Sequence, residues 1–126
     1  MRQLLDTHIF IWFISGSDRL NGKVREQIEN NDNLLSIASL WEIAIKFSIG
    51  KLDLKLSIEQ LVEEQIIANG IEILDITTEH IAVVADLPLH HRDPFDRLII
   101  AQAKVEKIPV VGVDNVFDSY SIQRLW

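Results

Sequence analysis

The sequence contains no cysteine among its 126 residues. That absence excludes a disulfide framework and any metal site built from thiolates, and it fits a reducing compartment. Glycine and proline are also scarce, at five and three residues, and fall singly along the chain. We find no repeat, low-complexity tract or linker. We therefore expect one domain over residues 1–126, long enough to bury a sizeable core.

The sequence has no apolar run long enough to span a bilayer. The apolar segment LLDTHIFIWFISG near the start carries Asp6. It also lacks the basic flank and the small-residue cleavage site of a signal peptide. We expect a cytoplasmic protein with no membrane partner.

The sequence also has few basic residues. The 19 Asp and Glu residues outnumber the 12 Lys and Arg residues, which gives a formal net charge of −7. Proteins that hold nucleic acid by charge are usually basic, because each phosphate contact calls for a Lys or Arg. The composition argues against that class. It leaves room for an enzyme whose acids collect metal ions, because bound cations reverse the local field.

Short apolar segments alternate with amphipathic ones along the chain. Ser39 and Ser57 read as helix N-caps, Gly50 and Gly70 as helix ends, and Pro94 as a first helical residue. The pattern predicts an α/β fold whose mainly parallel sheet is covered by helices on both faces. The expected strands are residues 2–6, 33–37, 71–76, 108–113 and a short edge strand at 121–126, and the expected helices are 7–16, 20–31, 39–50, 57–70, 78–87 and 93–107.

Acidic residues stand where these strands end or where helices begin. Asp6 and Asp114 each end a predicted strand, and Glu42 lies in the first predicted turn of the helix from Ser39. Functional groups of parallel α/β sheets gather at the carboxyl ends of the strands, so these three acids should share one rim. Asp96 reaches that rim if its helix starts there.

Each acid also has a structural explanation. Glu42 three residues after Ser39 fits a capping box. Asp93 before Pro94 fits an N-cap, and the helix dipole favours Asp96 at the third position. Asp6 and Asp114 would then be loop acids.

Taken together, the acids favour a cation site. Four carboxylates on one rim would repel one another unless cations neutralised them. Carboxylate oxygens suit Mg²⁺ or Mn²⁺, and the sequence has no dense His or Cys cluster of the kind that Zn²⁺ prefers. Such ions suit phosphodiester hydrolysis.

Basic residues near this rim have two interpretations each. Lys46 is one turn after Glu42, so it pairs with that carboxylate or reaches a substrate phosphate. His80 is read as a satisfied polar residue. Residues 90–92 (His-His-Arg) are read as a solvated loop, with contact to a phosphate backbone as the alternative.

Three segments, LLDTHIFIW, SLWEIAIKFSIGKLDL and HRDPFDRLIIAQA, occur in an order that resembles the PIN-domain family. More narrowly, they resemble the VapC-type toxins of bacterial toxin–antitoxin pairs. The resemblance covers nearly the whole chain. It implies a compact three-layer α/β/α fold and an endoribonuclease that hydrolyses RNA with a water activated by Mg²⁺, for which Mn²⁺ substitutes. It also implies a cognate antitoxin as partner and a homodimer, with the apolar first helix and neighbouring segments at the interface.

The resemblance also assigns site residues. Relatives usually carry Thr or Ser two residues before the fourth acid, where this chain has Gly112, so Asp114 is the least certain ligand and Asn115 or Asp118 could share its work. Asp93 would cap the helix, with a role at the site left open. The acids that correspond to the catalytic and metal-binding residues of the family are Asp6, Glu42, Asp96 and Asp114.

Two other functions were weighed. A regulatory PIN-like domain would hold metal or a basic partner through the same acids without turnover. A phospho-acceptor receiver domain would need an adjacent acid pair after the first strand and a Lys after the last. The segments RQLLDTH and PVVGVDN supply neither feature.

Overall fold

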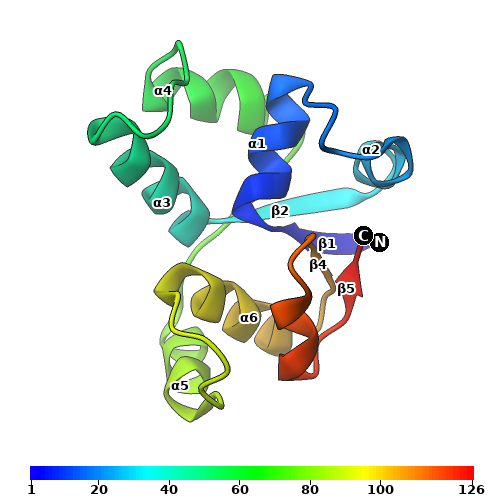
Figure 1. Ribbon diagram of the computed structural model, residues 1–126, viewed down its shortest axis with the longest axis vertical. Helices are drawn as coiled ribbons and strands as arrows, with labels where there is room; N and C mark the ends of the chain where they lie inside the picture. Colours follow the sequence, from blue (N-terminus) through cyan, green and yellow to red (C-terminus); the bar gives the residue numbers. More distant parts are fainter.

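The computed structural model describes all residues, 1–126, and places a five-stranded sheet at the centre of the molecule (Figure 1). Every neighbouring pair of strands is parallel, in the order β3-β2-β1-β4-β5. The predicted parallel sheet and its C-terminal edge strand are therefore confirmed. The strands are β1 (Arg2–Leu5), β2 (Asp32–Ser36), β3 (Glu72–Leu74), β4 (Val110–Val111) and β5 (Arg124–Leu125).

Helices fill most of the connections between the strands. They are α1 (Thr7–Ser15), α2 (Gly22–Glu29), α3 (Ile37–Ser48), α4 (Ile58–Gln60), the π-helix η1 (Leu61–Ile67), α5 (Thr78–Asp86), α6 (Pro94–Glu106) and the 3₁₀ helix η2 (Asn115–Tyr120). None of them has the length and apolar content that crossing a bilayer requires.

The two faces of the sheet carry separate cores, because successive side chains of a strand point to opposite faces. Leu5 of β1 packs in a core with residues of α1, α2, α3 and η1. Its neighbour Leu4 packs on the other face against Ile99 and Ala103 of α6. Helix α5 packs on α6, outside the sheet (Figure 1). The result is the expected three-layer α/β/α arrangement.

The start of α3 differs from the prediction. The helix begins at Ile37, and its N-cap is Ser36, whose hydroxyl accepts a hydrogen bond from the Ala38 backbone N–H at 3.0 Å. Strand β2 runs straight into the helix through this serine, so no loop separates them. Ser39 is a buried helical residue and accepts a hydrogen bond from the Thr7 hydroxyl at 2.8 Å.

Other predicted helix ends are confirmed. Ser57 and Gln60 form the capping box at the start of α4. Gly70 adopts a left-handed conformation after η1, with φ of 71°. The Asp93 carboxylate caps α6 and Pro94 is its first residue.

Strand β4 is shorter than the predicted strand of residues 108–113. Only Val110 and Val111 form ladder residues, and the chain then turns into η2, a helix that was not predicted. The sheet reverses its strand order between β1 and β4, since β2 and β3 extend from one side of β1 and β4 and β5 from the other. Ligands of open α/β sheets bind at such a reversal, beyond the carboxyl ends of the strands.

Candidate active site

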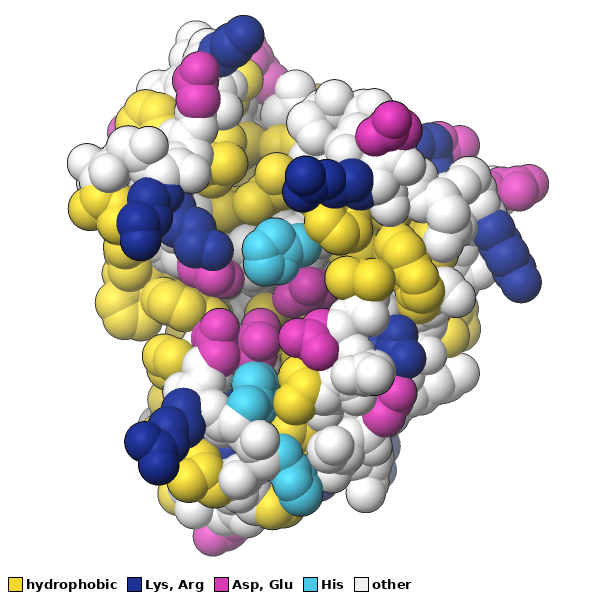
Figure 2. All heavy atoms as spheres, in the orientation of Figure 1, with side chains coloured by type: hydrophobic (Ala, Val, Ile, Leu, Met, Phe, Trp, Pro, Cys, Tyr) yellow, Lys and Arg dark blue, Asp and Glu magenta, His cyan; other side chains and the backbone are white.

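A cavity of about 510 Å³ opens at this reversal point. Figure 2 shows acidic side chains gathered in the hollow at the middle of one face, with histidines close by and Lys or Arg side chains around its margin. The four acids proposed from the sequence all line the cavity. The complete lining is Asp6, Thr7, His8, Trp12, Arg19, Glu42, Asp93, Asp96, Val113, Asp114 and Phe117.

Asp6 lies deepest among these acids. It follows β1 and occupies the N-cap position of α1, yet its side chain makes no capping hydrogen bond. Its backbone N–H is bonded to the Val111 carbonyl of β4 at 3.0 Å, which fixes the residue at the junction of the two strands. The carboxylate is buried and lines the cavity, and His8 Nδ1 lies 3.9 Å from its Oδ2.

The pKa of Asp6 is raised from 3.8 to about 7, first by burial and then by the negative charges of Asp96, Glu42 and Asp114. The Thr7 backbone N–H acts in the opposite direction. A buried carboxylate with three acidic neighbours is unfavourable in its charged form unless a cation compensates it.

Asp96 enters the cavity from the first turn of α6, whose N-terminus points at the same hollow. The pKa of Asp96 is raised to about 6, chiefly by burial and then by the charge of Asp93. His91 acts against this rise, with its Nε2 3.5 Å from Asp96 Oδ2. Asp93 lines the cavity too, but its Oδ1 accepts the backbone N–H groups of Phe95 and Asp96, at 2.9 and 3.1 Å.

Glu42 reaches the cavity from α3. Because that helix begins at Ile37, Glu42 lies in its second turn, and the predicted first-turn position and capping box with Ser39 are both wrong. The carboxylate is largely buried and pairs with Lys46 Nζ at 3.0 Å, so the predicted i,i+4 pair is confirmed. Lys46 supplies a local countercharge on one side of the acidic hollow.

Asp114 is the most exposed of the four proposed ligands. It precedes η2, and its Oδ1 accepts the backbone N–H of Val116 at 3.0 Å. Asn115 and Asp118, which were expected to share its work, do not line the cavity. Asp118 forms a two-pronged ion pair with Arg124, with both N···O distances at 3.0 Å, and this pairing lowers the pKa of Asp118.

The chemistry of this donor set fits a hard divalent cation, because the four carboxylates offer oxygen atoms and carry unbalanced negative charge. Nevertheless, no three His, Asp or Glu side chains lie close enough together to enclose an ion. Glu42 is drawn to Lys46, and Asp114 caps η2. Closing the carboxylates around a cation therefore requires side-chain rearrangement.

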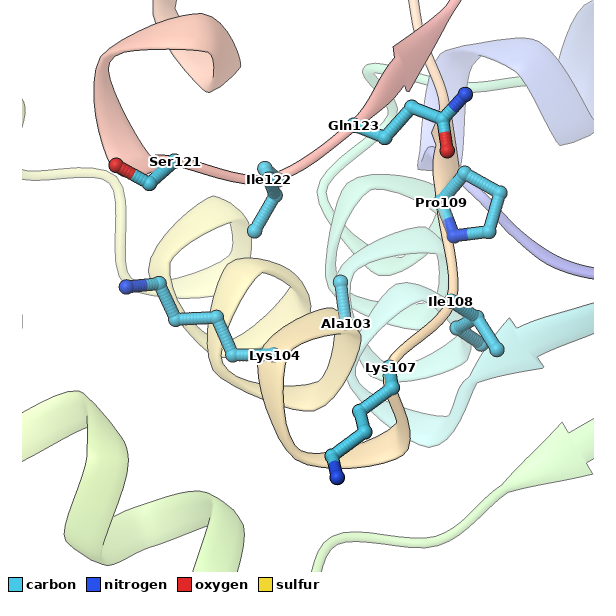
Figure 3. Close-up of a pocket in the computed structure, with 8 residues that line it drawn as sticks. All are labelled: Ala103, Lys104, Lys107, Ile108, Pro109, Ser121, Ile122 and Gln123. Atoms are coloured by element: carbon cyan, nitrogen blue, oxygen red, sulfur yellow. The ribbon is translucent and has the colours of Figure 1, made fainter.

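A second cavity, of about 290 Å³, lies at the opposite end of α6 (Figure 3). It is lined by Ala103, Lys104, Lys107, Ile108, Pro109, Ser121, Ile122 and Gln123, and so by no carboxylate. It offers no carboxylate to a divalent cation, in contrast to the acidic hollow with its five.

The family of the chain follows from a comparison with models of protein families. The model of the PIN domain matches residues 4–122. The chain belongs to the PIN-domain family. No curated protein matches it by sequence.

Solved structures agree with this PIN-domain fold. A chain of VapBC2 from Rickettsia felis, bound to a promoter DNA fragment, matches with a TM-score of 0.73 and 17% identity, covering 99% of this chain and 98% of that one. FitAcB from Neisseria gonorrhoeae matches with a TM-score of 0.73 and 20% sequence identity, covering 98% of this chain and 96% of that one. DNA-bound VapBC from Salmonella typhimurium matches with a TM-score of 0.73 and 20% sequence identity, covering 99% of this chain and 97% of that one.

Gly112 stands where a Thr or Ser was expected, and its surroundings leave little space for a side chain. A Cβ atom at position 112 would lie 3.3 Å from the ring of Phe117 and 3.5 Å from Asp6 Cβ. Phe117 is buried and lines the cavity, so its ring occupies the room that a larger residue would need. A glycine beside Asp6 is thus matched to the phenylalanine of η2.

Sequence reasoning missed part of the surroundings of this site. His91 is not the solvated loop residue that was predicted, since its side chain is only 18% exposed and its Nδ1 lies 2.7 Å from Tyr120 Oη. The one available signal was the position of His91 in the segment HRDPFDR, directly before α6. His80 is buried and bonded to Thr77 and Glu106, which confirms its structural reading.

Proposed function

We propose that the chain is a metal-dependent endoribonuclease that hydrolyses RNA phosphodiester bonds, and that it acts as the VapC-type toxin of a toxin–antitoxin pair. Its resident ion is Mg²⁺, for which Mn²⁺ substitutes. The ligands are Asp6, Glu42, Asp96 and Asp114. Membership in the PIN-domain family and the fold match to VapBC structures support the class of activity.

One observation carries the proposal: four carboxylates from separate elements meet in one hollow, and the deepest of them has a raised pKa. Packing alone gives no reason to bury Asp6 among like charges, because the exposed His8 is 3.9 Å away and a poorly paired buried carboxylate costs stability. A bound divalent ion would lower the pKa of a water molecule and neutralise charge that develops on the phosphate. We propose that the acids of this chain hold such an ion once their side chains close around it.

The residues around the acids have separate tasks in this proposal. Asp93 fixes the first turn of α6 and hence the direction from which Asp96 enters. Lys46 and Arg19 are cations at the hollow, and they are suited to contact RNA phosphates on either side of the scissile bond. Close contacts of this kind allow a chain of net charge −7 to bind RNA locally.

The proposed partners are those of a VapC-type toxin. We propose a cognate antitoxin that places a basic side chain in the acidic hollow, where it would compete with the cation. We also propose a homodimer, and we expect the protein to act in the cytoplasm.

A regulatory PIN domain without turnover is the second candidate. The observation that favours it is the spacing of the acids, since no three of them are already assembled around one point. Such a protein would bind Mn²⁺ or a basic partner and leave RNA intact.

The test is cleavage of a mixed RNA pool by the purified chain with Mg²⁺, with Mn²⁺, or with EDTA followed by metal add-back. We expect cleavage only with metal, and its loss in Asp6→Asn and Asp96→Asn with the circular-dichroism spectrum preserved. Asp86→Asn is the matched control, because this exposed acid at the end of α5 lies outside the cavity. Undiminished cleavage by both site variants would overturn the proposal, whereas metal binding without any cleavage would favour the regulatory candidate.

A further inference from the structure

A single buried hydroxyl holds the loop that leads into α6. Tyr120, at the end of η2, is 1% exposed, and its Oη lies among the backbone of this loop. The backbone N–H groups of His90 and His91 donate to it, at 3.2 and 3.1 Å. Arg97 Nη1 lies 3.4 Å from the same oxygen.

The number of donors around the Tyr120 hydroxyl determines where its own hydrogen points. A tyrosine hydroxyl has one hydrogen to donate and two lone pairs that accept. The two backbone N–H groups already occupy the lone pairs, and Arg97 adds a third donor, so the hydroxyl hydrogen must point to an acceptor. The acceptor within reach is His91 Nδ1, at 2.7 Å.

The tautomer of His91 follows from this count. A neutral imidazole that accepts at Nδ1 carries its hydrogen on Nε2. Nε2 is buried and has no hydrogen-bond partner, and it lies 3.5 Å from Asp96 Oδ2. At that separation the pair is at the outer limit of a hydrogen bond, and a small movement of either side chain closes it.

Arg97 holds the same loop from the side of α6. Its guanidinium donates to the Pro88 carbonyl at 3.0 Å and lies within 3.5 Å of the carbonyls of Val84, Leu87 and His91. Because Arg97 directly follows Asp96, the loop, the histidine and the carboxylate are held as one unit.

We infer that His91 is a positioning residue of the site, which Tyr120 holds as the Nε2–H tautomer so that it donates to one oxygen of Asp96. The other oxygen would then be left to bind the cation. Hydrogen bonds to metal-binding carboxylates orient them, and losing such a partner commonly lowers metal affinity by about 10- to 100-fold. The role of His91 rests on the proposed function, whereas its tautomer does not.

The tautomer is tested first, by long-range ¹H–¹⁵N spectra of the metal-free protein near neutral pH. We expect Nδ1 of His91 without a hydrogen and Nε2 with one. In Tyr120→Phe we expect that preference to weaken, with thermal unfolding recorded to confirm that the variant folds. A hydrogen on Nδ1 of His91 in the wild type would overturn the inference, whatever the enzyme does.

The positioning role is tested by Mn²⁺ affinity, measured by calorimetry without RNA. His91→Leu is expected to weaken binding about 10- to 100-fold, and His91→Gln to restore much of it, because its amide can donate from the position of Nε2. His90→Leu is the matched control, since this exposed neighbour does not line the cavity and only its backbone N–H, which the substitution keeps, bonds Tyr120. Wild-type affinity in His91→Leu would overturn the role alone. No Mn²⁺ binding by the wild type would instead contradict the proposed function, and the role with it.

Discussion

The buried carboxylate of Asp6 lowers the stability of the fold, and we propose that it is needed for function. The side chain is buried in a hollow lined by three further acids of the proposed site, and nothing in its hydrogen bonding requires an acid there. An amide of the same size would avoid the repulsion. The proposed cation gives a reason for a carboxylate at this position.

The raised pKa of Asp6 predicts how stability changes with pH. Without divalent metal, the folded protein holds this proton up to about pH 7, whereas the unfolded chain releases it near 3.8. Stability therefore falls as pH rises through this window. We expect a loss on the order of 2 kcal/mol from about pH 5 to about pH 8, relative to Asp6→Asn, in chemical denaturation.

The same experiment has a second arm. Adding Mn²⁺ at about pH 8 should stabilise the wild type more than Asp6→Asn, because the ion binds the folded state through this carboxylate. Identical pH profiles for wild type and variant, with and without Mn²⁺, would contradict the account of Asp6.

At the scale of elements, the start of α6 assigns different roles to the two acids of the DPFD segment. Asp93 serves the helix through two backbone hydrogen bonds, and Asp96 faces the cavity from the third helical position. Asp93→Ala should lower the free energy of unfolding by about 1 kcal/mol through loss of the cap. Asp93→Ser should keep both the cap and metal-dependent RNA cleavage. Loss of cleavage in a stably folded Asp93→Ser would instead make Asp93 part of the site.

Helix ends that depend on residues close together in the sequence were predicted well. The caps at Ser57 and Asp93 and the left-handed Gly70 use short-range backbone chemistry, which a sequence displays directly. The start of α3 was misplaced because Ser36 and Ser39 are both capable N-caps. Only tertiary packing, in which Thr7 bonds Ser39, decides between them.

The end of β4 was misjudged for a related reason. The run IPVVGV reads as one strand, yet only two residues pair, and Arg124 donates to the carbonyls of Gly112 and Val113 instead. A contact between residues more than ten positions apart leaves no local signal. The hydroxyl of Tyr120 and its hold on His91 escaped prediction for the same reason.

At the scale of the whole molecule, the strand order brings the site together. The reversal between β1 and β4 sets Asp6 and Asp114 at one opening, and α3 and α6 bring Glu42 and Asp96 to it. The parallel sheet, and hence the shared rim, could be predicted from periodicity and from the resemblance to PIN domains. The spacing of the carboxylates could not, because it depends on side-chain partners such as Lys46.

The surface of α3 predicts self-association. Trp41, Ile45 and Ile49 are 61%, 37% and 59% exposed and recur every fourth residue, so they form an apolar stripe on one side of the helix. The apolar residues of α1, by contrast, are largely turned into the core. We therefore expect the proposed dimer to use α3 in place of α1, and Ile45→Lys to shift the sedimentation of the purified chain from dimer toward monomer. A wild type that stays monomeric at every concentration would contradict this.

The central claim is that the acids of the hollow hold a divalent cation. Its most direct test is a crystal structure of the chain grown with Mn²⁺, with the ion located by its anomalous scattering. The account predicts a Mn²⁺ peak bound by Asp6 and Asp96, with Glu42 or Asp114 directly or through water, and no peak in Asp96→Asn. Ordered carboxylates at a saturating concentration of Mn²⁺ with no peak among them would contradict it.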